Sequence, residues 1–154
     1  MPPFVPDWAP NVHPMLVHFP IAWLIAAILV DFVACGLPRQ RWPDVVCTVL
    51  YPVATISALV TYATGRQAAA TVLTPGLAHA VVQQHWNWAL ATTIFFAVYS
   101  AARVGLFFKI RSLGPPHRVV LALVALAGLV LLFYTGELGA RLVYEYGVGV
   151  RSPR

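Results

Sequence analysis

Four long apolar runs dominate this sequence and limit what it can fold into. They cover residues 15–37, 45–64, 86–108 and 119–143. Each is close to the roughly 20 residues that an α-helix needs to cross about 30 Å of hydrocarbon. The loops between the runs are short, so little of the chain is left for a separate soluble domain. The sequence therefore predicts one all-α domain over residues 1–154, an integral membrane bundle of four transmembrane helices.

Composition and charge support this class and exclude another. The chain is 60% hydrophobic and only 10% charged, against roughly 45–50% and 25% in ordinary soluble domains. The formal charge of +5 comes from cations scattered singly along the chain. Without a basic patch or a recognition motif, we expect the lipid bilayer and no nucleic acid as a partner. The N-terminal segment has no Lys or Arg, and the apolar run behind it is too long for a signal peptide, so we expect no cleavable leader.

The positions of the cations predict an orientation. The loops after the first and third runs carry five of the ten: Arg39, Arg41, Lys109, Arg111 and Arg118. By the positive-inside rule these loops are predicted to be cytoplasmic, which puts both termini in the periplasm of a bacterial inner membrane. The loop after the second run has only Arg66, in agreement with this orientation. Arg151 and Arg154 in the tail oppose it weakly.

Four of the five histidines fall at the predicted periplasmic end: His13, His18, His79 and His85. In "NVHPMLVHFPIAW", Pro14 suits the first turn of a helix, while Pro20 lies inside it and frees a carbonyl one turn earlier. We therefore expect a kink near Phe19. His18 would lie about 7 Å deeper than His13, where an ionisable side chain needs a partner. The alternative for both is an interfacial imidazole that hydrogen-bonds to water or lipid.

A second group of histidines, His79 and His85, lies near the start of the third run. His85 directly precedes that run, in "HWNWAL". We expect an interfacial helix around His79 to run into this segment, with Trp86 and Trp88 in an aromatic belt. His85 then lies at a depth comparable with His18. Small residues follow it on the same face, namely Ala89, Thr92 and Thr93. They could let a flat ligand approach, or they could simply form a helix–helix contact.

Two histidines on facing helices are what a non-covalent haem b requires, since its iron takes one neutral imidazole on each face. This pattern predicts His18 and His85 as the iron ligands, with His13 and His79 beside them and their mutual pairing open. Arg141 could hold the haem propionates. Alternatively, Arg141 forms a salt-bridge set with Glu137 and Glu145, which lie four residues to either side.

Other kinds of site have less basis in the sequence. The four histidines could bind Zn or Cu instead of haem. Cys35 and Cys47 form no C-x-x-C pattern, which gives no basis for a disulfide or a covalently attached haem. Asp31 lies near the cytoplasmic end, where it could accept an internal hydrogen bond or pair with Arg103 or Lys109. No nucleophile stands beside a base at a suitable spacing, so a hydrolase is not indicated.

Several motifs together resemble a known bacterial membrane family. They are "HPMLVHFPIA" at 13–22, "TG" at 64–65, "HWNWAL" at 85–90 and "LVYEYGVGV" at 142–150. The sequence is similar to the family catalogued as domain of unknown function twenty-two thirty-one over nearly its whole length. The resemblance implies a four-helix membrane domain, sometimes found with Rieske or cytochrome c modules, with a suspected haem b role. The motif histidines of the family fall on His13, His18 and His85.

The C-terminal tail departs from that family. A histidine often precedes the final G-V-G-V, but here Tyr146 takes its place, and a phenol is an unusual partner for a low-spin haem. The segment from Gly136 to Gly139 is also less glycine-rich than usual. Gly147 is expected to end the last helix in the left-handed conformation. The turn that follows could close a pocket beside His13 and His79, or it could dock a partner subunit.

Together these patterns predict a membrane electron-transfer subunit with one haem b near the periplasmic face. It would pass electrons between a quinol or a membrane haem subunit and a periplasmic redox protein, so we expect a respiratory complex subunit more than an enzyme. A cofactor-free accessory or anchor subunit of a larger membrane complex is the main alternative. A histidine-cluster metal protein is the second, and a homo-oligomer remains open.

Overall fold

The computed structural model describes residues 11–37, 40–110 and 113–150. These residues form α1 (His13–Leu16), α2 (His18–Gly36), α3 (Trp42–Thr71), the short 3-10 helix η1 (Gly76–Ala78), α4 (His79–Lys109) and α5 (Pro115–Tyr144). The described part holds four stretches that are long and apolar enough to cross a membrane, with α1 and α2 counted as one and η1 joined to α4. The all-α, four-helix membrane architecture predicted from the sequence is thereby confirmed.

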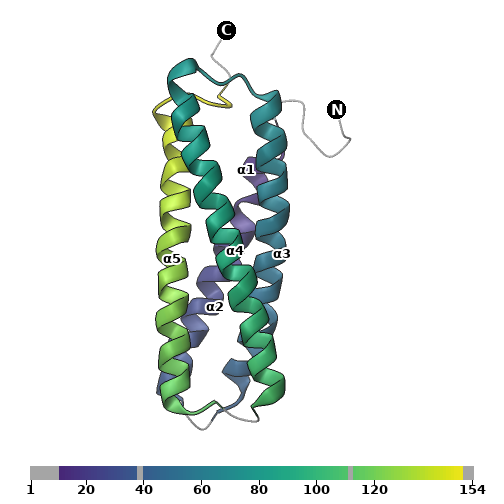
Figure 1. The fold of residues 1–154 in the computed structure, drawn as a ribbon, viewed down its shortest axis with the longest axis vertical. Coiled ribbons are helices and arrows are strands. Elements are labelled where there is room, and N and C mark those ends of the chain that lie inside the picture. Colours follow the sequence, from purple (N-terminus) through teal and green to yellow (C-terminus); the bar gives the residue numbers. More distant parts are fainter. Residues whose placement is uncertain (1–10, 38–39, 111–112, 151–154) are drawn as a thin grey trace.

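The helices run up and down in an antiparallel bundle (Figure 1). The upright helices α3 and α5 flank the bundle, α4 crosses diagonally in front of them, and α1 with α2 crosses behind. One end, which we call the His13 end, holds α1, η1, the start of α4 and the last turns of α3 and α5. The opposite end, the Gly36 end, holds the end of α2 and the start of α5.

The helices are longer than the apolar runs. The third run starts at residue 86, but α4 already begins at His79, directly after η1. The expected interfacial stretch is therefore continuous with the membrane helix and is not a separate element. Similarly, α3 continues past residue 64 to Thr71. Backbone hydrogen bonding extends each helix into polar sequence, because water or headgroups can solvate the side chains there.

Proline divides the first membrane segment. The α-helix is interrupted at Val17, between α1 and α2, slightly before the kink expected near Phe19, although the Val17 N–H still donates to the His13 carbonyl at 3.2 Å. Pro20 has no N–H to give to the carbonyl of Leu16, one turn earlier. The hydroxyl of Thr61 on α3 donates to that carbonyl instead, at 3.2 Å. The freed backbone group thus ties α1 to its neighbour.

The bundle consists of two similar hairpins. The first hairpin is α1 to α3, and the second is α4 with α5. In Figure 1, α3 and α5 stand on opposite sides, while α4 in front slopes the opposite way to α2 behind. This is the arrangement that a half turn about the long axis produces. The sequence keeps the same spacing, since Asp31 follows His13 by eighteen residues and Arg103 follows His85 by eighteen. The molecule therefore has an approximate two-fold axis between its hairpins.

Buried ion pairs join the hairpins across this axis. Arg103 lies 3.0 Å from Asp31, and both side chains are almost fully buried. The hydroxyls of Tyr51 and Tyr99 also donate to the Asp31 carboxylate, at 2.6 and 3.2 Å. Of the partners expected for Asp31, the structure thus shows Arg103 together with internal hydrogen bonds, and not Lys109. A charge inside a membrane bundle is tolerated because partners such as these compensate it.

The second ion pair closes the Gly36 end. Arg118 lies 2.7 Å from Asp44 and also donates to the carbonyls of Ala34, Leu37 and Gln40. Its side chain is only 1% exposed. Arg118 thus supplies donors to the Ala34 carbonyl in the last turn of α2 and to two carbonyls of the chain that follows, where regular helical hydrogen bonding ends.

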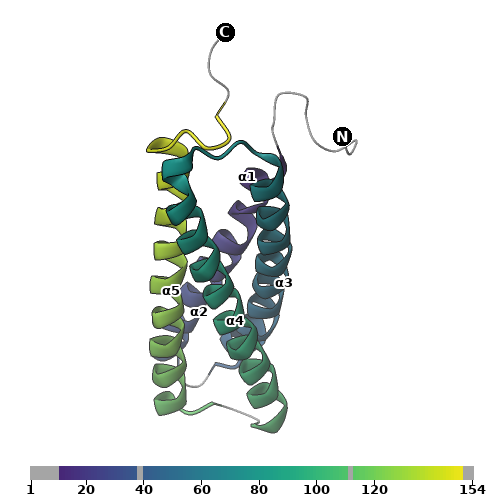
Figure 2. The ribbon, with the colours of Figure 1, turned by 45° about the horizontal axis from the view of Figure 1, so that its top comes forward.

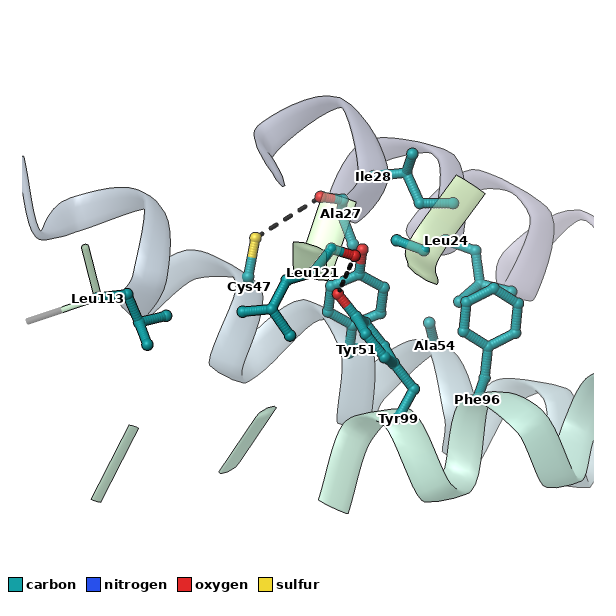
Figure 3. Close-up of a cluster of buried hydrophobic side chains, with 11 residues drawn as sticks. Leu24, Ala27, Ile28, Cys47, Tyr51, Ala54, Phe96, Tyr99, Leu113 and Leu121 are labelled. Atoms are coloured by element: carbon teal, nitrogen blue, oxygen red, sulfur yellow. Dashed lines mark hydrogen bonds between the residues drawn. The ribbon is translucent and has the colours of Figure 1, made fainter. Parts of the chain in front are cut away.

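Apolar packing between the hairpins is concentrated away from the His13 end. Figure 3 shows the larger core cluster, in which Tyr51 and Phe96 lie among smaller side chains from all four long helices. Within the described residues, a smaller cluster at the His13 end contains Ala78, Val81, Leu138 and Leu142, all from the second hairpin. Neither cluster joins the two hairpins at the level of His13.

The C-terminal tail folds back over the second hairpin. Gly147 has φ +66°, and the N–H groups of Gly147 and Val148 donate to the carbonyls of Val143 and Leu142. Gly147 thus ends the helix in the left-handed conformation, as expected, with hydrogen bonds one residue wider than those of a Schellman motif. Tyr146 and Val148 pack on the small cluster. Tyr146 therefore has a packing role at the position where the resemblance led us to expect histidine, and Figure 2 shows the tail beside α4.

Candidate functional site

His13 is held against α3 by a hydrogen bond and by a glycine. Its Nδ1 lies 3.1 Å from the backbone oxygen of Thr61. A carbonyl can only accept, so Nδ1 carries the proton and Nε2 keeps its lone pair. The ring packs directly on Gly65, where a Cβ would lie 2.9 Å from His13 Cε1. The absence of a side chain at this position is what lets the imidazole reach the helix backbone.

His85 is held against α5 in the same way. Its Nδ1 lies 3.0 Å from the backbone oxygen of Thr135, which again leaves Nε2 with a lone pair. A Cβ on Gly139 would lie 3.2 Å from His85 Cε1. In both hairpins the histidine contacts a carbonyl and a glycine four residues further along the neighbouring helix.

The two imidazoles occupy equivalent positions about the approximate two-fold axis. Residues at other equivalent positions meet across this axis, as Asp31 does with Arg103. His13 and His85 likewise belong to opposite hairpins and lie at the same end of the bundle, beside the last turns of α3 and α5. The structure therefore places two half-buried histidines, one from each hairpin, at the His13 end of the bundle, each with its Nδ1 engaged.

The threonines that follow His85 have a packing role. Thr92 and Thr93 are buried, and the hydroxyl of Thr92 lies 2.9 Å from that of Thr135 on α5. This contact favours the helix–helix interpretation of the small residues. It also fixes the turn of α5 whose carbonyl holds His85, so the threonines support the site indirectly.

The remaining residues predicted for the site lie elsewhere. His18 is exposed, and its Nδ1 has a long contact, 3.4 Å, with the Met15 carbonyl of its own segment. His79 is exposed at the start of α4. Arg141 is bound to Glu145 at 2.8 Å, and its side chain is 41% exposed. On a helix, Arg141 lies about 200° around the axis from Gly139, on the far side of α5 from His85.

The comparison with known families agrees with this architecture. Residues 9–152 match the family described as "predicted membrane protein (DUF2231)". The chain belongs to this family. No curated protein and no solved structure matches it. The resemblance noted in the motifs of this DUF2231 protein is confirmed, while the family description says nothing of a cofactor or a reaction.

Sequence reasoning missed the residues that hold the histidine rings. Thr61 with Gly65 and Thr135 with Gly139 form the same T-x-x-x-G pattern, once in each hairpin. The repeat would have indicated a matched pair of sites. The contact between Arg66 and Trp86 was also missed, although both residues had been noted, Trp86 as part of the aromatic belt. They directly follow Gly65 and His85 in the sequence, and the Arg66 guanidinium stacks 3.4 Å from the Trp86 ring centroid.

The donor set suits a haem better than a bare metal ion. Within the described ranges, no three His, Cys, Asp or Glu side chains gather as a metal centre. Haem supplies four nitrogens itself and asks the protein for only two axial ligands. His13 and His85 offer two neutral imidazoles whose tautomers are fixed by backbone carbonyls, as in well-ordered metal ligands.

Proposed function

We propose that this protein binds one haem b between its hairpins, with His13 and His85 as the axial ligands, and serves as a membrane electron-transfer subunit. The observation that carries the proposal is the matched support of the two rings. Each Nδ1 is bound to a carbonyl, and each ring lies against a glycine of the neighbouring helix. His13 thus takes the role that depth alone assigned to His18.

The packing of the bundle supports a cofactor at this level. The large core joins all four long helices toward the Gly36 end, and the small cluster stays within the second hairpin. The two hairpins are held together by buried ion pairs in the other half. The His13 end can therefore adapt to a flat molecule between the hairpins without loss of the main core.

The two imidazoles decide what chemistry such a site supports. A haem with both axial positions filled by histidine supplies one-electron transfer. Thr61 and Thr135 hold the protons on Nδ1, so both Nε2 atoms remain basic ligands at neutral pH. With both positions taken, the chain offers no open coordination site for oxygen chemistry.

The position of His13 and His85 in the bundle suggests between which partners electrons pass. A single site near one end cannot by itself move an electron across the whole membrane. We infer a relay between a quinol or a membrane haem subunit and a redox protein on the His13 side, which the cation distribution predicts to be periplasmic. The bacterial inner membrane is the corresponding location.

Absorption spectroscopy of the purified protein tests this proposal. The protein is produced with an adequate haem supply, solubilised in detergent, and measured oxidised and then reduced with dithionite. We expect a low-spin b-type spectrum that is lost in His13→Ala and in His85→Ala. His18→Ala is the matched control, since His18 lies nearby on the same segment but is exposed.

Each other result has a definite meaning. A spectrum lost in His18→Ala and kept in His13→Ala would restore the ligand pair predicted from depth. A featureless spectrum from well-folded wild-type protein would overturn the haem proposal. The accessory-subunit hypothesis would then be favoured, and copurification of a larger membrane complex would be the next measurement.

A further inference from the structure

Arg66 and Trp86 form a contact between the two hairpins directly beside the histidine pair. Arg66 follows Gly65, on which the His13 ring packs, and Trp86 follows His85. The guanidinium carbon lies only 3.4 Å from the centroid of the indole ring. A cation stacked face-on to Trp is a favourable contact, and this one joins α3 to α4.

Among the described residues, both side chains keep hydrogen-bond donors without an acceptor. Trp86 Nε1 is buried and has no partner among the described residues. An indole N–H can only donate, and leaving it buried and unpaired is unfavourable. Face-on stacking uses the face of the guanidinium and leaves its N–H groups free in the plane. The described residues include no ion pair of Arg66.

The nearby charges leave Arg66 as the cation suited to an anion here. In the described part of the chain, Asp31 and Asp44 are paired at the other end, with Arg103 and Arg118. Arg141, the cation predicted for this role from the sequence, is bound to Glu145 on the far side of α5. Of these arginines, all within the described residues, Arg66 is thus the one that could meet a carboxylate at this end of the bundle.

We propose that Arg66 and Trp86 bind a propionate carboxylate of the haem held by His13 and His85. This inference rests on the proposed function and adds the residues that orient the macrocycle. The propionates of haem b lie on one edge of an otherwise apolar ring, so an anchor at that edge selects one rotational setting. Arg66 would contribute charge and Trp86 Nε1–H a directed hydrogen bond to the same carboxylate.

Haem with free propionates and haem dimethyl ester together test this assignment. The ester keeps the iron and the ring but removes the negative charge. Apoprotein is titrated with each compound, and affinity is read from the low-spin spectrum. For Arg66→Gln we expect about tenfold weaker binding of haem b, equivalent to about 1.4 kcal/mol, and unchanged binding of the ester. Arg141→Gln is the matched control and should bind both compounds like wild type.

A second variant separates charge from stacking. Trp86→Phe keeps an aromatic face under Arg66 but removes Nε1–H. We expect it to weaken haem b binding severalfold and to leave the ester unaffected. If the ester loses as much affinity as haem b in both variants, the contact only braces the hairpins and the propionate site is overturned.

The failure of each proposal gives a different result. If wild-type protein binds neither compound, the haem function itself fails. If wild type binds both but Arg141→Gln selectively loses haem b, the anchor lies on α5 and the assignment to Arg66 is wrong. If haem b and its ester bind wild type equally well and Arg66→Gln changes neither, Arg66 serves the membrane interface and the inference is overturned.

Discussion

At the scale of single residues, the two glycines beside the histidine rings are the most sensitive positions. A methyl group on Gly65 would lie 2.9 Å from His13, and one on Gly139 would lie 3.2 Å from His85. Overpacking costs about 1 to 3 kcal/mol, so we expect haem binding to weaken roughly five- to hundredfold. Gly65→Ala should have the larger effect, measured as haem content per purified protein.

Gly105→Ala is the control for this pair. It lies on α4, where an added Cβ meets nothing within 4 Å. We expect normal haem content and slightly higher helix stability, because Ala is the better helix former. Normal haem content in Gly65→Ala as well would show that the His13 ring does not need its close approach to α3.

The choice between His13 and His18 shows where sequence reasoning ended. The depth of each histidine along the first helix could be estimated from the sequence, and depth favoured His18 as the ligand. The rotation of that helix against α3 was not readable, because it depends on the break at Val17 and on the Thr61 carbonyl, forty-eight residues away. His85 was predicted as a site residue from its own segment. Its hydrogen-bond partner, the Thr135 carbonyl on α5, could likewise not be predicted from the sequence.

Asp31 illustrates a second single-residue effect. Asp31→Asn removes the charge that compensates buried Arg103 and weakens two tyrosine hydrogen bonds. Breaking a buried pair in this way costs about 3 to 5 kcal/mol, so we expect a marked fall in unfolding temperature in detergent. Combining Asp31→Asn with Arg103→Gln should recover part of the loss, since no unpaired charge remains. Equal stability of the single variant and wild type would contradict this account.

At the scale of elements, hydrophobic run length was sufficient to predict the membrane helices, while their junctions required the neighbours. Pro20 indicated a freed carbonyl, but only the packed α3 shows that Thr61 donates to Leu16. We expect Thr61→Val to destabilise the bundle by about 1 kcal/mol. Pro20→Ala should remove this dependence, because an alanine at this position has a backbone N–H that can itself bond to the Leu16 carbonyl.

A double-mutant cycle measures this coupling. Unfolding in mixed micelles is compared for Thr61→Val, Pro20→Ala and the double variant. We expect the Thr61→Val cost to vanish in the Pro20→Ala background. Equal cost in both backgrounds would mean that Thr61 stabilises α1 through some contact other than the freed carbonyl.

At the scale of the whole molecule, the approximate two-fold axis has a consequence for assembly. Like a dimer, the bundle joins two similar hairpins, but the residues that meet across the axis carry opposite charges. Two copies of the first hairpin would place Asp31 against Asp31, and two copies of the second would place Arg103 against Arg103. Like charges brought together in a membrane are strongly unfavourable, so the ion pairs select the mixed pairing.

Expression of the chain as two fragments tests this selection. A cut within the described loop between Thr71 and Gly76 separates residues 1–74 from residues 75–154 without breaking a helix. We expect the fragments to copurify when produced together and to show the haem spectrum only then, since each contributes one histidine. Differently tagged copies of residues 1–74 should not copurify with each other.

Charge substitutions then distinguish specific pairing of the two fragments from non-specific association. Arg103→Asp in the second fragment would place two carboxylates against each other, so we expect it to abolish copurification. Lys109→Asp, which changes the same charge on an exposed residue of α4, should leave copurification intact. If Arg103→Asp fragments still copurify with residues 1–74, apolar packing alone chooses the partner, and the buried charges serve only to close the Gly36 half of the bundle.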